Sequence, residues 1–282
     1  MVVDSSAQTP PDLARRLGLV VVPIHVTVDG RCWREGVDLD ADTFWARVGD
    51  GPDFPEITTS QPSPGEFLTT YRDLAGAGAE AVVSVHVGSE HSGTVNAARL
   101  AAAEAPVPVE VVDTGTASFG VTLCAWAAVD ALAAGHGPAE AARRARAAAD
   151  GIGTVFVVGA LDVVRRSGRL DATLTDAAGD ADRAGEVLVF GGTGGDIEVI
   201  GAGTTVAELC AVMASAFPTG VASRAAVAVA DDASRPLADG LSAALAGREG
   251  IVELVHYRVG PSVAAHLGPG TGGGFWLPVD TG

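Results

Sequence analysis

The first thing this sequence lacks is lysine. Its 282 residues include 18 basic side chains, all of them arginine, against 35 Asp and Glu, which gives a net charge of −17. Without Lys, the chain cannot form a phosphate-binding loop that ends in Gly-Lys, a Lys Schiff base or a Lys general base. So acidic a chain also argues against nucleic acid and anionic membranes as partners, because both are bound through clusters of Lys and Arg.

Cysteines and long apolar runs are also scarce. Cys32, Cys124 and Cys210 are far apart and have neither the spacing of a metal site nor that of a disulfide framework. Cys124 and Cys210 lie in Ala-rich stretches, where we expect buried thiols that pack as small hydrophobic side chains. The N-terminus does not resemble a signal peptide, and the longest apolar stretch, 123–134, is interrupted by Asp130. We therefore expect a cytoplasmic protein with no membrane insertion.

Apolar residues make up 48% of the chain and aromatic residues only 5%. In the first half, apolar runs without alternation, which are typical of parallel strands buried on both faces, are followed by helical stretches. The expected strands are 20–26, 81–87 and 107–112, and the expected helices are 64–75, 92–105, 118–134 and 138–150. This rhythm predicts a parallel α/β sheet. Val2 and Val3 are too short for a strand, so we expect the natural start to lie a few residues upstream.

The second half has a different pattern. Expected strands cover 154–158, 225–230 and 251–259, a Gly-rich turn joins the hairpin strands 187–190 and 197–200, and a last strand follows the glycines near 270. Expected helices cover 161–166, 206–217 and 237–246. Strand pairs with short connections favour an α+β domain with some antiparallel pairing. We therefore expect an α/β protein in which an N-terminal parallel-sheet domain, 1–160, and an α+β domain, 161–282, enclose a ligand cleft.

A first group of hydroxyl side chains occurs in the segment Thr-Thr-Ser-Gln-Pro-Ser-Pro, which ends where a helix is expected to start. Pro64 suits the first helical position, and Ser63 can cap the helix together with Glu66. This cap does not account for Thr59 and Ser60, which become candidate ligand-binding residues.

A second group, Ser92, Gly93 and Thr94, follows the strand that ends at Val87 and opens the next helix. In a parallel sheet this is the carboxyl end of a strand, where ligands bind beside helix N-termini. Free backbone N–H groups and the helix dipole favour an anion there, Ser92 adds a hydroxyl donor, and Gly93 allows close approach. An ordinary helix cap explains the same residues equally well.

Three other motifs do not support the chemistry that they suggest. Gly268-x-Gly270-x-x-Gly273 formally matches a dinucleotide fingerprint, but it leads into an expected strand where the fingerprint requires a helix. His86, Glu90 and His91 lack the spacing of a helical zinc motif. The chain has no Gly-x-Ser-x-Gly motif of the kind that positions the serine of many hydrolases.

The order of these segments resembles the DegV family. The segments that carry the resemblance are Asp4-Ser5-Ser6, Val21-Val22-Pro23-Ile24-His25-Val26, Glu35-Gly36-Val37-Asp38-Leu39, TTSQPSPGEF, SVHVGSEHSGT, VVDTGTASFG, Ser167-Gly168-Arg169-Leu170 and the C-terminal AAHLGPG. The resemblance is collinear over about the first 170 residues, is weak from Asp171 to about Phe217, and returns at the C-terminus.

The resemblance implies a bacterial two-domain fatty-acid-binding protein of the EDD fold, a carrier and not an enzyme, without cofactor or metal. It implies a long-chain fatty acid as ligand, with its carboxylate held by Thr59, Ser92 and a C-terminal histidine, here His266. The Arg of the family's Gly-Gly-Arg-Ile-Ser segment falls on Arg169. It further implies a fatty acid kinase as partner, to which the carrier presents the carboxylate for acyl phosphate formation.

This chain departs from the family pattern in its second half. Members that work with the kinase carry an Asn-Ala-Arg segment after the second-domain hairpin, where this chain has Gly201-Ala202-Gly203-Thr204 and no Arg. We therefore predict weaker coupling to a kinase. An alternative function is a lipid hydrolase in which Ser92 is the nucleophile and His266 the base, and the missing hydrolase motif argues against it.

Overall fold

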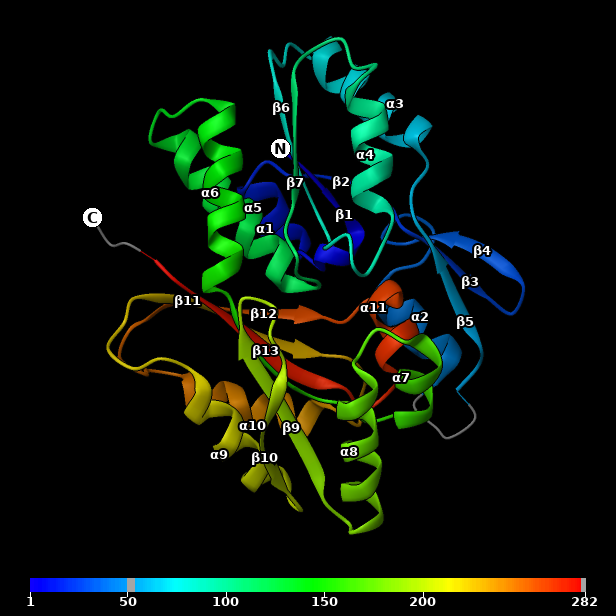
Figure 1. Ribbon diagram of the computed structural model, residues 1–282, viewed down its shortest axis with the longest axis vertical. Helices are drawn as coiled ribbons and strands as arrows, with labels where there is room; N and C mark the ends of the chain where they lie inside the picture. Colours follow the sequence, from blue (N-terminus) through cyan, green and yellow to red (C-terminus); the bar gives the residue numbers. More distant parts are fainter. Residues whose placement is uncertain (50–53, 280–282) are drawn as a thin grey trace. The chain divides into compact units, whose positions relative to one another are not determined.

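The computed structural model describes residues 1–49 and 54–279 (Figure 1). The chain forms two compact units: the first comprises Met1–Leu39 and Thr58–Asp150, and the second comprises Asp40–Ile57 and Gly151–Gly282. Each unit is described by itself below.

The division of the chain differs from the expected boundary at residue 160. Strand β8 (Gly153–Val157) pairs within the sheet of the second unit, so the first unit ends at Asp150. The segment 40–57, expected in the first domain, belongs to the second unit. The Trp45 Nε1–H donates to the Val259 carbonyl over 2.9 Å, and Asp42 lies 2.9 Å from the Arg258 guanidinium. No periodic pattern in the sequence indicates that the segment 40–57 packs on a distant part of the chain.

The first unit is built on a parallel sheet, as predicted. Its strands are β1 (Val2–Asp4), β2 (Val20–Val22), β6 (Val82–His86) and β7 (Val109–Asp113), in the order β2-β1-β6-β7. Its helices are the 3-10 turn η1 (Ser5–Ala7), α1 (Pro11–Arg16), α3 (Pro64–Gly76), α4 (Thr94–Ala102), α5 (Phe119–Ala133) and α6 (Pro138–Gly151). Although β1 has only three residues, it pairs with β2 on one side and with β6 on the other.

The expected strand 20–26 is two strands in two sheets. Pro23, which has no N–H to donate to a ladder, separates β2 from β3 (His25–Val28). β3 pairs antiparallel with β4 (Arg31–Arg34) across an Asp29-Gly30 turn, in which both residues have positive φ. The three-stranded sheet has the order β4-β3-β5, where β5 is Ile57–Ser60.

Helices cover both faces of the parallel sheet. α3 and α4 pack together with Val2, Val22 and Val82 through small residues of α4 such as Ala97 and Ala101. α5 contacts β1, β6 and η1, and its residues from Phe119 to Trp126 are buried on all sides, which explains the apolar sequence of this part of the helix.

The second unit is a six-stranded sheet in the order β10-β9-β8-β13-β11-β12, in which only β11 and β12 are parallel. The further strands are β9 (Val187–Thr193), β10 (Glu198–Gly203), β11 (Ser223–Val229), β12 (Ile251–Arg258) and β13 (Gly272–Pro278). Its helices are α2 (Ala41–Val48), α7 (Leu161–Ser167), α8 (Ala172–Arg183), α9 (Val206–Ala216), α10 (Arg235–Leu245) and α11 (Pro261–Leu267). The mixed α+β pattern was predicted, whereas α8 and α11 were not.

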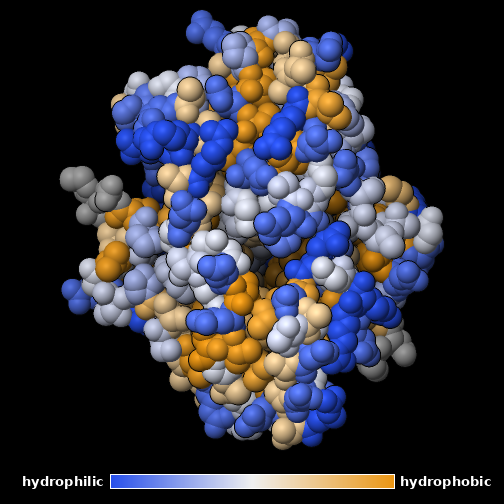
Figure 2. Space-filling model, in the orientation of Figure 1, coloured by the Kyte–Doolittle hydropathy of each residue, from blue (hydrophilic) through white to orange (hydrophobic). Residues whose placement is uncertain are grey.

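The two faces of this sheet are packed differently. Val155, Val157 and Val189 point to the face covered by α9 and α10, where most apolar side chains are fully buried. Phe156, Leu188 and Phe190 alternate with them and point to the other face, covered by α7, α8 and α11. On this second face, here called the α7–α8 face, most apolar side chains are only partly buried. Apolar side chains reach the surface of the second unit around β9 (Figure 2), where Val187 is 38% exposed.

Candidate functional site

The first unit has a topological switch point between β1 and β6. β1 leads to β2 on one side and β6 leads to β7 on the other, so the loops that leave the adjacent ends of β1 and β6 diverge. Ligands of open α/β sheets bind where such loops part, outside the carboxyl ends of the strands. We call this region the carboxyl edge: it consists of Asp4–Ala7 after β1 and Val87–Gly93 after β6. Ser92 and Gly93 therefore lie where the topology favours a ligand.

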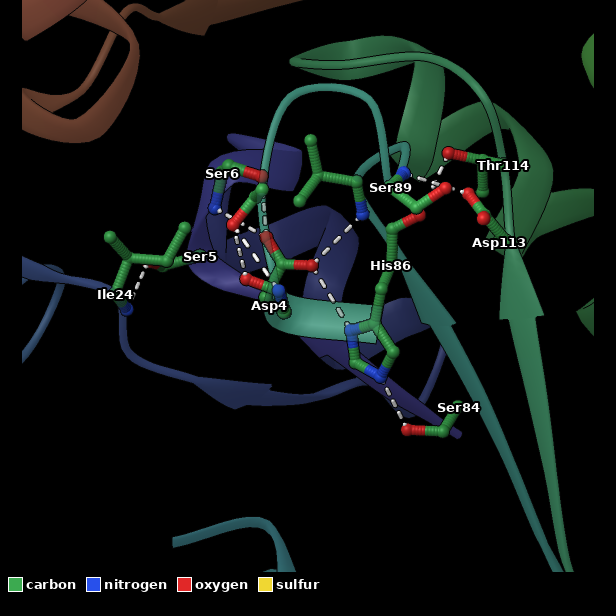
Figure 3. Close-up of polar contacts among 12 residues, drawn as sticks. Asp4, Ser5, Ser6, Ile24, Ser84, His86, Ser89, Asp113 and Thr114 are labelled. Atoms are coloured by element: carbon green, nitrogen blue, oxygen red, sulfur yellow. Dashed lines mark hydrogen bonds and ion pairs between the residues drawn. The ribbon is translucent and has the colours of Figure 1, made fainter. Parts of the chain in front are cut away.

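A buried polar network supports the carboxyl edge (Figure 3). The Asp4 Oδ2 accepts the Val87 N–H over 3.1 Å and lies 3.0 Å from the His86 Nδ1. The His86 Nε2 is 2.6 Å from the Ser84 Oγ, which in turn lies 2.9 Å from the Tyr71 hydroxyl. Asp4, Ser84 and His86 are fully buried. The network fixes the ends of both strands and leaves these side chains no access to a ligand in solvent.

The ionisation of this network follows from its contacts. Burial raises the pKa of the Asp4 carboxyl, but the hydrogen bond and charge of His86 and the bonds from Ser6 and Val87 outweigh it, so the pKa lies below its ordinary value. Burial also raises the pKa of Tyr71 to about 12, although its bond to Ser84 acts in the opposite direction. Asp4 is therefore a carboxylate and Tyr71 a neutral phenol at neutral pH.

Ser5 connects the carboxyl edge to the three-stranded sheet. Its Oγ donates to Glu35 Oε2 over 2.5 Å and accepts the Ile24 N–H over 2.8 Å. Glu35 is itself buried, and Gln8 Nε2 donates to its second oxygen over 3.3 Å. Sequence reasoning used Asp4 and Glu35 only as family landmarks and missed their structural role. The sequence did contain a signal for a buried polar network, since Ser84 and His86 interrupt an otherwise apolar strand.

The two candidate hydroxyl groups come together in the first unit. Gly93 lies directly against the side chain of Gln61, so that a Cβ added at Gly93 would overlap the Gln61 amide. Gln61 follows Thr59 and Ser60, and Gly93 stands between Ser92 and Thr94. Thr59 is half-buried and Ser60 exposed at the end of β5. Two segments about 30 residues apart in the sequence, each with candidate hydroxyl residues, are thus in contact through Gln61 and Gly93.

Within the second group, Ser92 and Thr94 are coupled. Their hydroxyl oxygens are 2.8 Å apart, and the Thr94 N–H donates to the Ser92 Oγ over 3.3 Å. Thr94 is fully buried and Ser92 half-buried, so Ser92 is the member that a ligand can reach. The helix itself begins at Thr94, two residues later than predicted, because Ser92 and Gly93 form the loop before it.

The cap predicted for α3 is present and is separate from the candidate residues. Ser63 Oγ accepts the Glu66 N–H over 3.2 Å, and Glu66 Oε2 accepts the Ser63 N–H over 2.8 Å. The second Glu66 oxygen lies 2.9 Å from the His25 Nε2. Burial raises the pKa of Glu66, but the bonds from Ser63 and the contact with His25 outweigh it and lower the pKa.

The remaining candidates, Arg169 and His266, belong to the second unit. Arg169 follows the left-handed Gly168 that ends α7; it is exposed, and its guanidinium donates to the Ser167 carbonyl over 3.2 Å. His266 lies half-buried in the last turn of α11. α7 and α11 pack against each other, with Gly268 in close contact with Ala160 and Val163. The ligand roles of Arg169 and His266 stay predictions.

Other chemistry finds little support in the described residues. In 1–49 and 54–279, no three or more His, Cys, Asp and Glu side chains are grouped so that they could hold a metal ion. The segment that contains Gly268, Gly270 and Gly273 leads from α11 into β13, so the dinucleotide fingerprint lacks its helix. Cys124 and Cys210 are buried, which raises the pKa of both thiols. Within the same residues, no helix combines the length and apolar character that a membrane span requires.

Comparison with known proteins identifies the family. The family model described as "Uncharacterised protein, DegV family" matches residues 1–279. The chain belongs to the DegV family. A DegV domain-containing protein of Streptomyces coelicolor is 35% identical over 277 residues, which cover 96% of this chain and 95% of the relative. DegV domain-containing protein Rv2417c of Mycobacterium tuberculosis is 35% identical over 276 residues, with 97% and 95% covered.

Solved DegV structures share the fold over nearly the whole chain. A DegV family protein from Thermus thermophilus, whose structure is described as showing fatty acid binding, is 30% identical with a TM-score of 0.83 and covers 99% of this chain and 98% of its own. DegV from Bacillus subtilis, described as a fatty acid binding protein, is 23% identical with a TM-score of 0.81 and the same coverage, and its likeness shows the fold alone. The resemblance stated from the sequence and the fold class predicted from it are thereby confirmed.

Proposed function

We propose that this DegV protein binds a long-chain fatty acid and holds its carboxylate at the carboxyl edge of the first unit. The observation that carries the proposal is the contact of Gln61 with Gly93, which joins the segment of Thr59 and Ser60 to the segment of Ser92 and Thr94. The fatty acid binding described for the Thermus thermophilus relative supports the same ligand class.

The chemistry of the edge suits a carboxylate. A carboxylate that leaves water needs hydrogen-bond donors, and bonds to a charged group contribute about 1.5–3 kcal/mol each. Thr59 and Ser92 supply hydroxyl donors, and α4 begins at Thr94 with its N–H groups unpaired within the helix. In this proposal Ser60 and Thr94 complete the hydroxyl group.

The second unit has an apolar face that is only partly buried. The α7–α8 face contains the partly buried side chains Phe156, Leu161, Leu174 and Leu188, which leave surface for an apolar ligand to cover. A cavity of about 610 Å³ shares Leu161 with this face, but charged side chains such as Arg165, Arg166 and Arg183 line it, so the apolar face itself is the better match for an alkyl chain. Burying a tail of about 15 methylenes at ~0.8 kcal/mol each offers on the order of 12 kcal/mol before the costs of ordering the tail.

Two substitutions test the carboxylate assignment. Ser92→Ala and Thr59→Val each remove one hydroxyl and nearly preserve shape, and each should weaken fatty acid binding by about 1–3 kcal/mol. Binding is measured by titration of the delipidated protein, with thermal unfolding as the control for folding. Native mass spectrometry of the purified protein should also detect a non-covalent fatty acid. Unchanged affinity in both variants would contradict the assignment of the carboxylate to Thr59 and Ser92.

We further propose that the protein is a carrier, not a catalyst, and that it couples only weakly to a fatty acid kinase. The hydroxyl that Ser92 contacts belongs to Thr94, which is not a general base. Where the family's kinase-coupled members carry an Arg, Thr204 is exposed, and its N–H and hydroxyl donate to Glu208 in the cap of α9.

A gain-of-function variant tests this coupling. Thr204→Arg should increase acyl phosphate formation by a cognate kinase, whereas Thr204→Gln, which is neutral, should not. Efficient acyl phosphate formation with the unmodified protein would show that the missing Arg is unimportant.

A further inference from the structure

An arginine-lined cavity in the second unit is not explained by fatty acid binding. Its volume of about 610 Å³ lies within the ~300–1,000 Å³ that is typical of small-molecule sites. α7 contributes Arg165 and Arg166 to its wall, and α8, which packs against α7 (Figure 1), contributes Arg183. Three arginines and two aspartates line the cavity, whereas the whole chain has 18 basic and 35 acidic residues. The cavity therefore reverses the charge balance of the chain.

The Arg165 guanidinium is held in place by α8. Its Nη2 donates to the Thr175 carbonyl over 3.3 Å, and the same atom lies where a Cβ added at Gly179 would overlap it. The helix dipole favours cations in the last turn of α7, which accounts for arginine there. It does not account for a glycine inside α8, which lowers helix stability relative to alanine. Gly179 makes room for a guanidinium at the cavity wall.

The other two guanidinium groups are accessible to a ligand. Arg166 is exposed, and it forms no hydrogen bond or ion pair with any residue in 1–49 and 54–279. Arg183 pairs with Asp180, but the two side chains are 71% and 74% exposed, so the pair contributes little free energy and can open. Because arginine stays protonated at every pH at which the protein is folded, both groups are permanent cations. An anion that enters the cavity thus meets positive charge that is not already neutralised by a tight ion pair.

The charge pattern of the lining indicates a class of ligand. Planar guanidinium groups bind phosphate through paired N–H donors. Asp162 and Asp182 line the same cavity; they would repel a compound that carries only anionic groups, but they accept hydrogen bonds from hydroxyls. We propose that the cavity binds a sugar phosphate. The phosphate contacts Arg165, Arg166 and Arg183, and the sugar hydroxyls donate to the two aspartates.

The same phosphate chemistry occurs in soluble esters and in lipid headgroups. The net charge of −17 repels the protein from an anionic bilayer, whose surface meets the field of the whole chain. A small ester inside the cavity is governed by the charges within a few ångströms, since more distant charges are screened by salt. The charge distribution therefore favours the soluble ester. This site does not depend on the proposed fatty acid binding.

Ribose-5-phosphate is the probe for this site, and titration calorimetry measures its binding. The unmodified protein should bind it more tightly than inorganic phosphate and should not bind ribose. Arg166→Gln, which breaks no contact of the folded protein, should weaken binding by about tenfold or more. Arg72→Gln is the matched control: it removes an exposed arginine from α3 of the first unit and should leave the affinity unchanged.

Gly179→Ala tests the support of Arg165. The added Cβ displaces the guanidinium, so the affinity for ribose-5-phosphate should fall about tenfold. The melting temperature should not fall, because alanine favours the helix and the atoms that it displaces are the end of a flexible side chain. Normal binding by this variant would contradict the role of Arg165 and overturn the proposed site.

Failure of this proposal is distinguishable from failure of fatty acid binding. No affinity for ribose-5-phosphate, equal affinity for inorganic phosphate, or equal affinity in Arg166→Gln would each overturn it. Binding to phosphatidic acid vesicles without binding to the soluble ester would also overturn it. Palmitate should bind to Arg166→Gln as it does to the unmodified protein. A loss of palmitate binding would assign the arginine to the fatty acid carboxylate, which would overturn the sugar phosphate site while fatty acid binding stands.

Discussion

At the carboxyl edge of the first unit, Asp4, Ser84 and His86 are fully buried and hydrogen-bonded, whereas on the α7–α8 face of the second unit most apolar side chains are only partly buried. The carboxyl edge is polar and fixed in detail, as a site for a charged group must be, because an unpaired buried polar atom is costly. The α7–α8 face is apolar and loosely filled, which suits an alkyl chain, because the free energy of apolar burial depends on the buried area and not on the direction of contacts. The difference teaches that a site for a charged group and a surface for an apolar group require opposite kinds of packing.

The largest expected effect tests the polar side of this comparison. Asp4→Ala leaves His86 and the Val87 N–H buried without their acceptor, so it should lower the free energy of unfolding by about 3–5 kcal/mol. Denaturant unfolding at neutral pH measures the effect. A loss below about 1 kcal/mol would show that the network is not a determinant of the fold.

The pH dependence of the unfolding free energy is a second test that distinguishes the carboxyl edge from the α7–α8 face. Because the pKa of Asp4 is lower in the folded state than in the unfolded chain, its contribution is present above the ordinary Asp pKa of about 4 and is lost as the pH falls through the folded value. The unfolding free energy of Asp4→Asn should therefore fall less steeply on acidification than that of the unmodified protein. Leu174→Ala, on the apolar face, should keep the full slope; equal slopes in all three proteins would contradict the assignment.

Paired leucine substitutions compare the two faces of the six-stranded sheet. Leu241 on α10 is fully buried, so Leu241→Ala should cost about 3 kcal/mol, whereas Leu174→Ala on α8, where the side chain is half-buried, should cost about 1 kcal/mol. Thermal or urea unfolding of the delipidated protein measures both. Equal costs would mean that the α7–α8 face is as tightly packed as the opposite face, leaving the tail no space.

The smallest expected effect concerns a polar contact at the surface. Glu66→Gln preserves the cap of α3, since Gln can still accept the Ser63 N–H, but weakens the contact with His25. Because the Glu66 side chain is 33% exposed, the loss should be only about 0.5 kcal/mol. A loss comparable to that of Asp4→Ala would show that polarity, and not burial, decides the cost.

The sequence predicted those elements whose signals are local. Non-alternating valine runs predicted the parallel sheet, and Ser63 with Glu66 predicted the cap of α3. Pro23 divided the strand 20–26 as its missing N–H requires, a signal that was available but not used. α8 was missed because its Asp- and Gly-rich sequence has weak helix propensity, and the helix depends on packing such as that of Gly179 against the Arg165 guanidinium.

The candidate site was predictable only in part. The residue types of Thr59 and Ser92 indicated an anion site, but the contact between their two segments is made by Gln61 and Gly93, and no local pattern encodes it. The association of residues 40–57 with the second unit likewise depends on contacts such as Trp45 with Val259.

The position of β13 determines the order in which the second unit can be completed during synthesis. This strand lies between β8 and β11, so it joins β8, β9 and β10 to β11 and β12. Until Gly272–Pro278 has left the ribosome, the nascent chain has two incomplete sheets, each with an open edge that can pair with another chain. The seven residues of β13 therefore close the sheet last, and a truncation that removes them would cost the unit its central pairing and expose two edges prone to aggregation.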